Sequence, residues 1–166
     1  MPITTNINTF IKNIKEKQKQ FPRLLLTPIA KDGPTRHDYK EQMSRIDLGE
    51  MHVWDDSCNN HSKPGDYFGY VENQLKTKNR DIKTEGTIKI YKIEAVCSHE
   101  HRLPSWSTNV GHQNRNVIIL SKKVYYTGTI LEFKKLTGYS LNWNCQGTTN
   151  VAKDKSDKYL KHISLY

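Results

Sequence analysis

The stretch KPGDYFGYV, residues 63–71, decides the class of fold that the sequence predicts. Its Pro-Gly-Asp triplet is typical of a turn, and we expect Asp66 to form that turn rather than to bind a ligand. The aromatic run that follows has strand character. Gly69 removes one side chain from this run, which indicates either a β-bulge or a close approach of neighbouring backbone. On a regular strand Tyr67 and Tyr70 would face opposite sides of a sheet, so at most one of them would line a pocket.

Further strands are predicted on both sides of this stretch. Residues 87–96 alternate apolar and polar side chains, which is the pattern of a half-buried strand. Residues 116–121 contain the run Val-Ile-Ile-Leu, as expected for a strand that is buried on both faces. Residues 23–30 and 51–54 are also expected to be short strands. The chain is therefore predicted to be rich in β-structure.

Residues 5–20 are predicted to form an amphipathic helix. Ile7, Phe10, Ile11 and Ile14 fall at the spacing that lines one helical face. We expect this apolar stripe to dock on the domain while the lysines of the helix stay in solvent. The alternative is that these lysines contact phosphate groups.

Two shorter helices are predicted within the chain. Residues 36–46 would place Tyr39, Met43 and Ile46 inward. Residues 129–137 begin with Thr129 and carry Glu132 three positions later, which is the spacing of a capping box. Gly138 is expected to end that helix. The segment after Val151 is rich in lysine and is expected to be a basic, aromatic tail.

The charge of the chain favours a polyanionic partner. There are 26 Lys and Arg residues against 17 Asp and Glu residues, which gives a formal net charge of +9. No run of about 18 apolar residues is present, and the N-terminus lacks a secretory signal pattern. We therefore expect an intracellular protein of cytoplasmic type that binds DNA or RNA and no membrane. The abundance of Lys, Asn and Ile fits an AT-rich genome, cellular or viral.

No familiar catalytic motif is present. The sequence contains no P-loop, GxSxG, HExxH or dinucleotide-binding glycine motif. Cys97, His99 and His101 alternate, so on a strand they would share one face and could ligate zinc, with Cys58, His61 or His112 as a fourth ligand. This trio lacks the paired spacing of structural zinc sites. We therefore expect no cofactor and no enzymatic activity. The third cysteine is Cys145, and an odd number of cysteines favours free thiols.

The order of these features resembles the PUA-like superfamily, particularly its EVE-type and related base-reading members. The matching pieces are Trp54, Gly65-Asp66, Ile90-Tyr91-Lys92-Ile93, Trp106, Val117 to Leu120, and Phe133 to Gly138-Tyr139. The resemblance implies an α+β fold, a small and strongly bent β-barrel over residues 48–151 with peripheral short helices. We expect a single domain in which residues 1–47 form an N-terminal helical extension and residues 152–166 form the tail.

The resemblance also implies binding of RNA, or of a flipped or modified DNA base in an aromatic pocket. A flipped base offers one face for stacking and one edge for hydrogen bonds. The candidate pocket residues are Trp54, Asp55, Tyr67, Trp106, Ser107, Asn109, Asn114 and Trp143, and the candidate phosphate-binding residues are Arg102, Arg115, Lys122 and Lys123. Trp106 and Asn109 are favoured because they lie in a polar loop rather than in an apolar run.

Two other classes of function remain open. The first is a structural or protein-interaction protein, such as a homodimer, that has no ligand pocket. The second is a metal-dependent hydrolase that uses Cys97, His99 and His101. The sequence does not distinguish DNA from RNA, or single from double strands.

Overall fold

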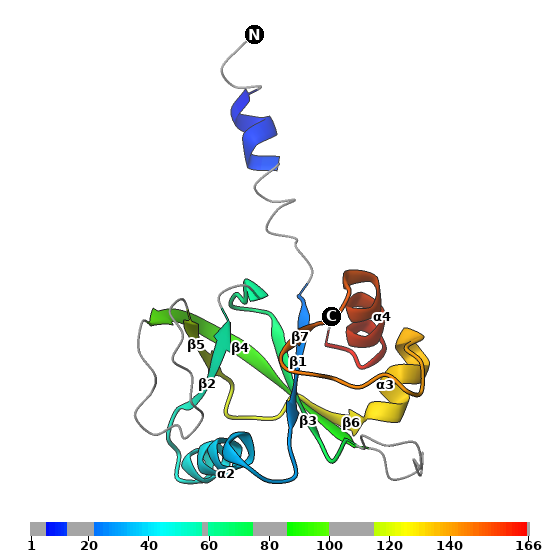
Figure 1. Ribbon diagram of the computed structural model, residues 1–166. Helices are drawn as coiled ribbons and strands as arrows, with labels where there is room; N and C mark the ends of the chain where they lie inside the picture. The colour runs from blue at the N-terminus through cyan, green and yellow to red at the C-terminus, as the bar shows by residue number, and fades with distance from the viewer. Residues whose placement is uncertain (1–5, 13–21, 58–59, 75–85, 100–114, 166) are drawn as a thin grey trace.

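The structure is a computed structural model that describes residues 6–12, 22–57, 60–74, 86–99 and 115–165. Its elements follow one another as β1 (Leu24–Ile29), α2 (Pro34–Asp47), β2 (His52–Ser57), β3 (Tyr67–Glu72), β4 (Thr87–His99), β5 (Arg115–Leu120), β6 (Tyr126–Thr129), α3 (Ile130–Thr137), β7 (Thr149–Asn150) and α4 (Lys153–His162). Residues 6–12 are also helical. The mixed α+β class that we predicted is confirmed (Figure 1).

The strands form one curled sheet in the order β2-β5-β4-β3-β1-β7, and β6 also pairs with β4. The bend lies within β4, whose first half pairs with β3 and whose second half pairs with β5. The register of β4 against β5 shifts between Ile93 and Ala95, and such a bulge increases the local twist of a strand. A curled sheet of this kind is consistent with the small, bent barrel that we expected.

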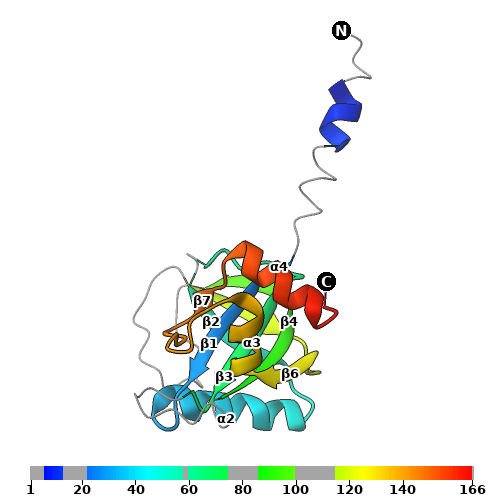
Figure 2. The same cartoon turned by 90° about the vertical axis from the view of Figure 1, so that its right-hand side faces the viewer.

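Alternating side chains build a separate core on each face of the sheet. The α3–α4 core contains Leu24, Leu26, Tyr67, Ile88, Ile90, Ile130, Phe133, Tyr159 and Leu160, and the α2 core contains Leu25, Tyr39, Trp54, Phe68, Tyr70, Tyr91, Ile93 and Ile118. Figures 1 and 2 show α2 on one side of β1 and β3, with α3 and α4 on the other. Tyr67 and Tyr70 therefore face opposite sides, as their spacing predicted.

Gly69 marks a close approach of core side chains, and neither a bulge nor the close approach of backbone that the sequence also suggested. β3 keeps an unbroken register with β4, in which Gly69 lies opposite Ile90. A Cβ atom on Gly69 would lie 2.6 Å from Cδ2 of Leu26 and 3.3 Å from Cγ2 of Ile88. The missing side chain thus makes room for two residues of the α3–α4 core.

The ends of α3 follow the local chemistry that the sequence predicted. The hydroxyl of Thr129 accepts a hydrogen bond from the backbone N–H of Glu132 at 3.1 Å. Gly138 adopts a left-handed conformation with φ of 79° and donates its N–H to the carbonyl of Lys134. The side chain of Glu132 accepts a hydrogen bond from the hydroxyl of Tyr126 at 3.1 Å.

We expect Thr129→Ala to lower the free energy of unfolding by about 1 kcal/mol, because it leaves the N–H of Glu132 without its cap. Urea unfolding followed by circular dichroism measures this change. Thr127→Ala is the matched control, since Thr127 is an exposed residue of the same strand that caps no helix. Equal losses in the two variants would show that the cap does not stabilise α3.

The N-terminal region differs from our expectation of a helical extension. Residues 6–12 are helical, but the side chains of Ile7, Phe10 and Ile11 are 50%, 65% and 43% exposed. The prediction that this stripe docks on the domain is therefore wrong for the described residues, because helical spacing only determines which side chains share a face. Farther along, β1 lies inside the sheet, parallel to β3 and antiparallel to β7.

The segment that we expected to be a tail contains α4, which packs on the sheet. Tyr159 and Leu160 are fully buried in the α3–α4 core. Ser156 is buried on the same helical face, and its hydroxyl accepts a hydrogen bond from the N–H of Leu24 at 3.0 Å. A serine within the apolar stripe obscures the helical pattern in the sequence, and this hydrogen bond explains its position.

Candidate nucleic-acid interface

The segment with the favoured binding residues begins and ends on one strand pair. His99 is the last residue of β4 and lies opposite Arg115, the first residue of β5. Arg115 in turn lies opposite Ser57, the last residue of β2. Residues 100–114 are therefore connected to the sheet at a place where three strand ends lie side by side.

Several of the predicted site residues lie outside the described part of the chain. They are Arg102, Trp106, Ser107, Asn109 and Asn114, together with the possible metal ligands Cys58, His101 and His112. For His99 and Arg115 the structure describes the backbone and not the side chain. Their predicted roles in base, phosphate or metal binding stay predictions.

The polar side chains beside this end of the sheet are buried and paired. Asp56 is 1% exposed and accepts hydrogen bonds from the side chains of Asn60, at 2.6 Å, and Ser62. Asp55, a predicted pocket residue, and Asn116 are also buried. Asp56 therefore fixes the loop that follows β2 rather than presenting a free carboxylate.

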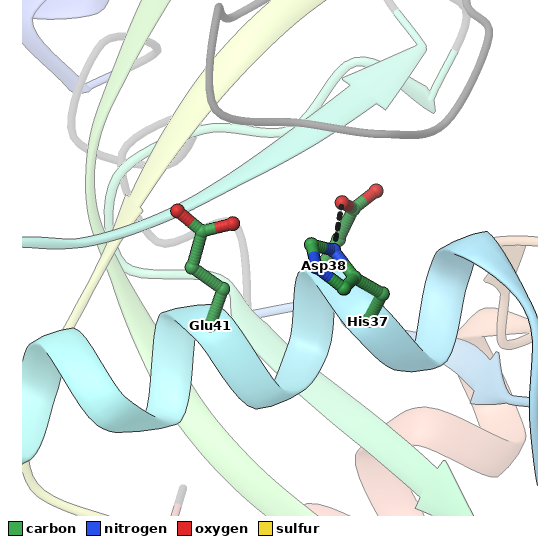
Figure 3. Close-up of side chains that lie close together, drawn as sticks. All are labelled: His37, Asp38 and Glu41. Atoms are coloured by element: carbon green, nitrogen blue, oxygen red, sulfur yellow. Dashed lines mark ion pairs between the residues drawn. The ribbon is translucent and has the colours of Figure 1, made fainter.

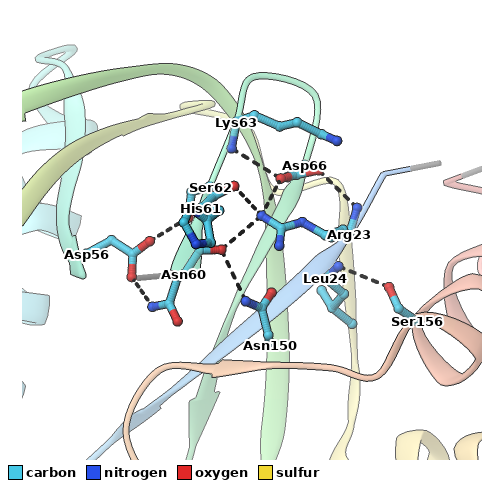
Figure 4. A network of polar contacts seen from close by, with 10 residues as sticks. All are labelled: Arg23, Leu24, Asp56, Asn60, His61, Ser62, Lys63, Asp66, Asn150 and Ser156. Carbon is cyan, nitrogen blue, oxygen red and sulfur yellow. Dashed lines mark hydrogen bonds and ion pairs between the residues drawn. The ribbon is translucent and has the colours of Figure 1, made fainter. Parts of the chain in front are cut away.

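Arg23 connects the same loop to β1 (Figure 4). Its guanidinium group donates to the carbonyl of Asn60 at 2.9 Å, to the carbonyl of His61, and to the carboxylate of Asp66 at 3.4 Å. The side chain of Asn150 on β7 donates to the same Asn60 carbonyl at 3.1 Å. These contacts hold the loop against the strands, so it forms a rigid neighbour of the strand ends.

Asp66 has the turn-forming role that we predicted. It is fully buried, and its carboxylate accepts hydrogen bonds from the backbone N–H of Arg23 at 3.0 Å and of Lys63 at 3.1 Å. Its own N–H donates to the carbonyl of Lys63, and Gly65 has a φ of 93°. Pro64 followed by a glycine with positive φ is the sequence requirement of a type II turn.

Trp54 and Tyr67, both predicted to line the pocket, are core residues on opposite faces of the sheet. Trp54 is 7% exposed in the α2 core and packs edge-on against Tyr70, with ring centroids 5.2 Å apart. Tyr67 is equally buried in the α3–α4 core. Burial raises the pKa of Tyr67, with Tyr125 as a second cause. The structure does not bring these two rings together in one pocket.

His52 is a buried polar residue of the α2 core that the sequence analysis did not single out. Its Nε2 lies 2.8 Å from the hydroxyl of Tyr70, and its Nδ1 lies 3.1 Å from the carbonyl of Ser121. Since a carbonyl only accepts, Nδ1 carries the proton and Nε2 accepts from Tyr70. Burial lowers the pKa of His52 to about 4, so the ring is neutral at pH 7.

The predicted phosphate-binding residues whose backbone the structure describes lie at opposite ends of β5. Lys122 and Lys123 follow β5 at the end opposite Arg115, and the length of this strand separates them by roughly 20 Å. The ammonium group of Lys122 donates to the carbonyl of Gly49, just after α2, which indicates a structural role for this lysine. Lys123 is exposed.

Trp143 lies on the α3–α4 side, in the loop between α3 and β7. Its ring stacks on Tyr139 with centroids 4.4 Å apart and an interplanar angle of 22°. It also packs against Phe133 of the α3–α4 core. The ammonium group of Lys155 lies 4.8 Å from the centre of the Tyr139 ring. Sequence reasoning selected Trp143 but missed the roles of Tyr139 and Lys155, which only the pairing of α3 with α4 brings together.

Among the described residues, one group of possible metal ligands lies close together: His37, Asp38 and Glu41 on α2 (Figure 3). The ion pair between His37 and Asp38 measures 3.6 Å, and Glu41 already pairs with Arg45 at 2.9 Å. The predicted ligand Cys97 is exposed on β4 and belongs to no such group within the described ranges. Burial raises the pKa of the third cysteine, Cys145, to about 11.

No family model and no curated protein sequence matches the chain. A solved structure with a similar arrangement is that of a mutant of the ZmASCH protein from Zymomonas mobilis. It has 11% sequence identity and a TM-score of 0.44, and the match covers 83% of this chain and 96% of that chain. No helix in the described part of the chain has both the length and the apolar character needed to cross a membrane.

Proposed function

We propose that the protein is a PUA-like nucleic-acid-binding module without catalytic activity, and that residues 100–114 form its recognition segment. The observation that carries this proposal is the pairing of His99 with Arg115, which holds both ends of the segment on one strand pair. Loops that carry binding residues on a rigid scaffold are a common arrangement for recognition. The segment contributes Trp106 and Asn109, which suit base stacking and hydrogen bonding to a base edge.

The loop with Asn60 and Ser62 follows β2, whose last residue pairs with Arg115, where this segment rejoins the sheet. Asp56 and Arg23 fix that loop through four hydrogen bonds to its side chains and carbonyls. A rigid neighbour lowers the entropy that a binding segment loses when it closes on a ligand. The net charge of +9 supplies the general attraction for a phosphate backbone.

A finer part of the proposal is that the segment recognises a flipped or modified base. Trp54 and Tyr67 are core residues, so Trp106 would supply the stacking ring in this interface. Asn109, Ser107 and Asn114 would contact the edge of the base, while Arg102 and Arg115 would contact phosphates.

We expect Trp106→Ala to weaken oligonucleotide binding by about 10-fold, because stacking of one base on an aromatic ring contributes about 1–3 kcal/mol. Fluorescence anisotropy with DNA and RNA oligonucleotides, with plain and modified bases and at two salt concentrations, measures the affinity. Tyr125→Ala is the matched control, since Tyr125 is an exposed aromatic residue that follows the opposite end of β5.

Binding that weakens with salt supports contacts to phosphates, and a preference for one modified base supports recognition by a pocket. A chain that binds no oligonucleotide, or that binds with no dependence on salt, would contradict the proposal. A stable dimer in light scattering together with absent oligonucleotide binding would favour the interaction-protein alternative.

A further inference from the structure

The face formed by α3, α4 and the loop between α3 and β7 carries a cluster of three aromatic rings. Phe133 is fully buried, and the rings of Tyr139 and Trp143 lie 5.7 Å and 5.8 Å from it between centroids. Trp143 stacks on Tyr139 at 4.4 Å. Tyr139 and Trp143 are both partly exposed. A stacked pair of partly exposed rings, Tyr139 and Trp143, therefore rests on the buried ring of Phe133.

The loop that carries Trp143 is held in place by hydrogen bonds. Gln74 pairs with both backbone groups of Cys145, donating to its carbonyl at 2.9 Å and accepting from its N–H at 2.8 Å. The buried ammonium group of Lys134 donates to the carbonyl of Leu141 at 2.9 Å. The backbone N–H of Trp143 donates to the carbonyl of Ser140 at 3.0 Å. Rings fixed in this way lose little entropy when a ligand stacks on them.

The two helices beside these rings carry an excess of positive charge, although Lys134 is buried and Lys153 is paired with Asp157. α3 and α4 together carry six lysines and three acidic residues, whereas α2 on the opposite face carries three basic and three acidic residues. The ammonium group of Lys155 donates to the carbonyl of Thr137 at 2.7 Å, so α4 lies beside the end of α3. The same ammonium group lies over the ring of Tyr139. Lys135, Lys158 and Lys161 are exposed.

We infer that this face is a second binding surface, which takes single-stranded nucleic acid. Partly exposed rings can stack only on bases whose faces are free, and a duplex keeps its base faces covered. The exposed lysines of α3 and α4 would meet the phosphates beside the stacked base. The inference rests on the proposed function, since it takes nucleic acid to be the partner, but it uses residues far from the segment 100–114 in sequence.

The first test compares a single-stranded 20-nucleotide oligothymidine with a 20-base-pair duplex in fluorescence anisotropy with the full chain. Trp143→Leu keeps an apolar side chain against Phe133 and removes the aromatic face. We expect this variant to bind the single strand about 5- to 10-fold more weakly and the duplex unchanged. Unchanged affinity for the single strand, or an equal loss for both probes, overturns the inference.

A second pair of variants keeps the test independent of any folding defect at Trp143. Lys158→Gln with Lys161→Gln should lower the slope of log affinity against log salt by about 1.4 on the single strand, at about 0.7 per phosphate contact. Lys40→Gln, an exposed lysine of α2, is the matched control and should change neither affinity nor slope. An unchanged slope in the double variant overturns the inference.

The two proposals fail in different ways. If the unaltered chain binds neither probe, the proposed function itself is wrong. If Trp106→Ala weakens binding while Trp143→Leu and the lysine variants bind like the unaltered chain, the proposed function stands and the second surface is wrong.

Discussion

Replacing Asp66 with alanine should lower the free energy of unfolding by roughly 3 kcal/mol. The variant leaves two backbone N–H groups, those of Arg23 and Lys63, without the carboxylate that accepts from them. Each unsatisfied buried donor costs about 1–3 kcal/mol. The ion pair to the Arg23 guanidinium adds little, since it measures 3.4 Å and the Arg23 side chain is 30% exposed.

The midpoint of urea unfolding should therefore fall while the slope of the transition stays the same. Asp66→Asn retains one acceptor oxygen but places an NH₂ group against one of the two N–H donors. Its free energy of unfolding should therefore lie between those of the native chain and the alanine variant. Asp32→Ala removes the same charge from an exposed position and should have almost no effect. A loss no larger than that of Asp32→Ala would show that the turn does not depend on this carboxylate.

The same network links the turn to the candidate interface. Asp66 and Arg23 act on the loop that Asp56 fixes from β2, beside the strand ends that connect to residues 100–114. A chain with a loosened turn would therefore present the proposed recognition segment on a less rigid scaffold. This is why stability must be measured alongside binding for any variant in this loop.

Features with a local cause could be predicted from the sequence. Pro64 and Gly65 dictate a turn by their own backbone preferences, and Thr129 caps α3 through a residue three positions away. The alternation of residues 87–96 likewise predicted most of β4, which extends to His99. The turn, the helix cap and the strand pattern each depend on a few neighbouring residues, so the rest of the chain has little effect on them.

Features set by distant parts of the chain could not be predicted. β1 is parallel to β3, and nothing within residues 24–29 indicates that partner. Trp54 and Tyr67 have the residue type of a stacking site, but the strand order and the covering helices bury them. α4 was missed because Ser156 interrupts its apolar face, and the reason for that serine is an N–H donor on β1.

Acidification from pH 7 to pH 5 should lower the free energy of unfolding by about 2 kcal/mol through His52 alone. The folded pKa is about 4 and the ordinary value is 6.5, so in this window the unfolded chain binds the proton and the folded chain does not. Stability from this group is present above pH 6.5 and is lost as the pH falls toward 4. The groups in contact with the ring, Tyr70 and Tyr91, stay neutral here because burial raises the pKa of both phenols.

The measurement is urea unfolding at several values of pH between 5 and 7, where most carboxylates remain ionised. His52→Asn keeps a donor for the carbonyl of Ser121 and removes the titrating ring, so it should be less stable at pH 7 and nearly independent of pH. Lys40→Asn is the control, since Lys40 is an exposed residue of α2, and it should keep the dependence of the native chain. If His52→Asn lost as much free energy of unfolding between pH 7 and pH 5 as the native chain, the titrating group would be another residue. The prediction that a neutral His52 stabilises the α2 core would then be wrong.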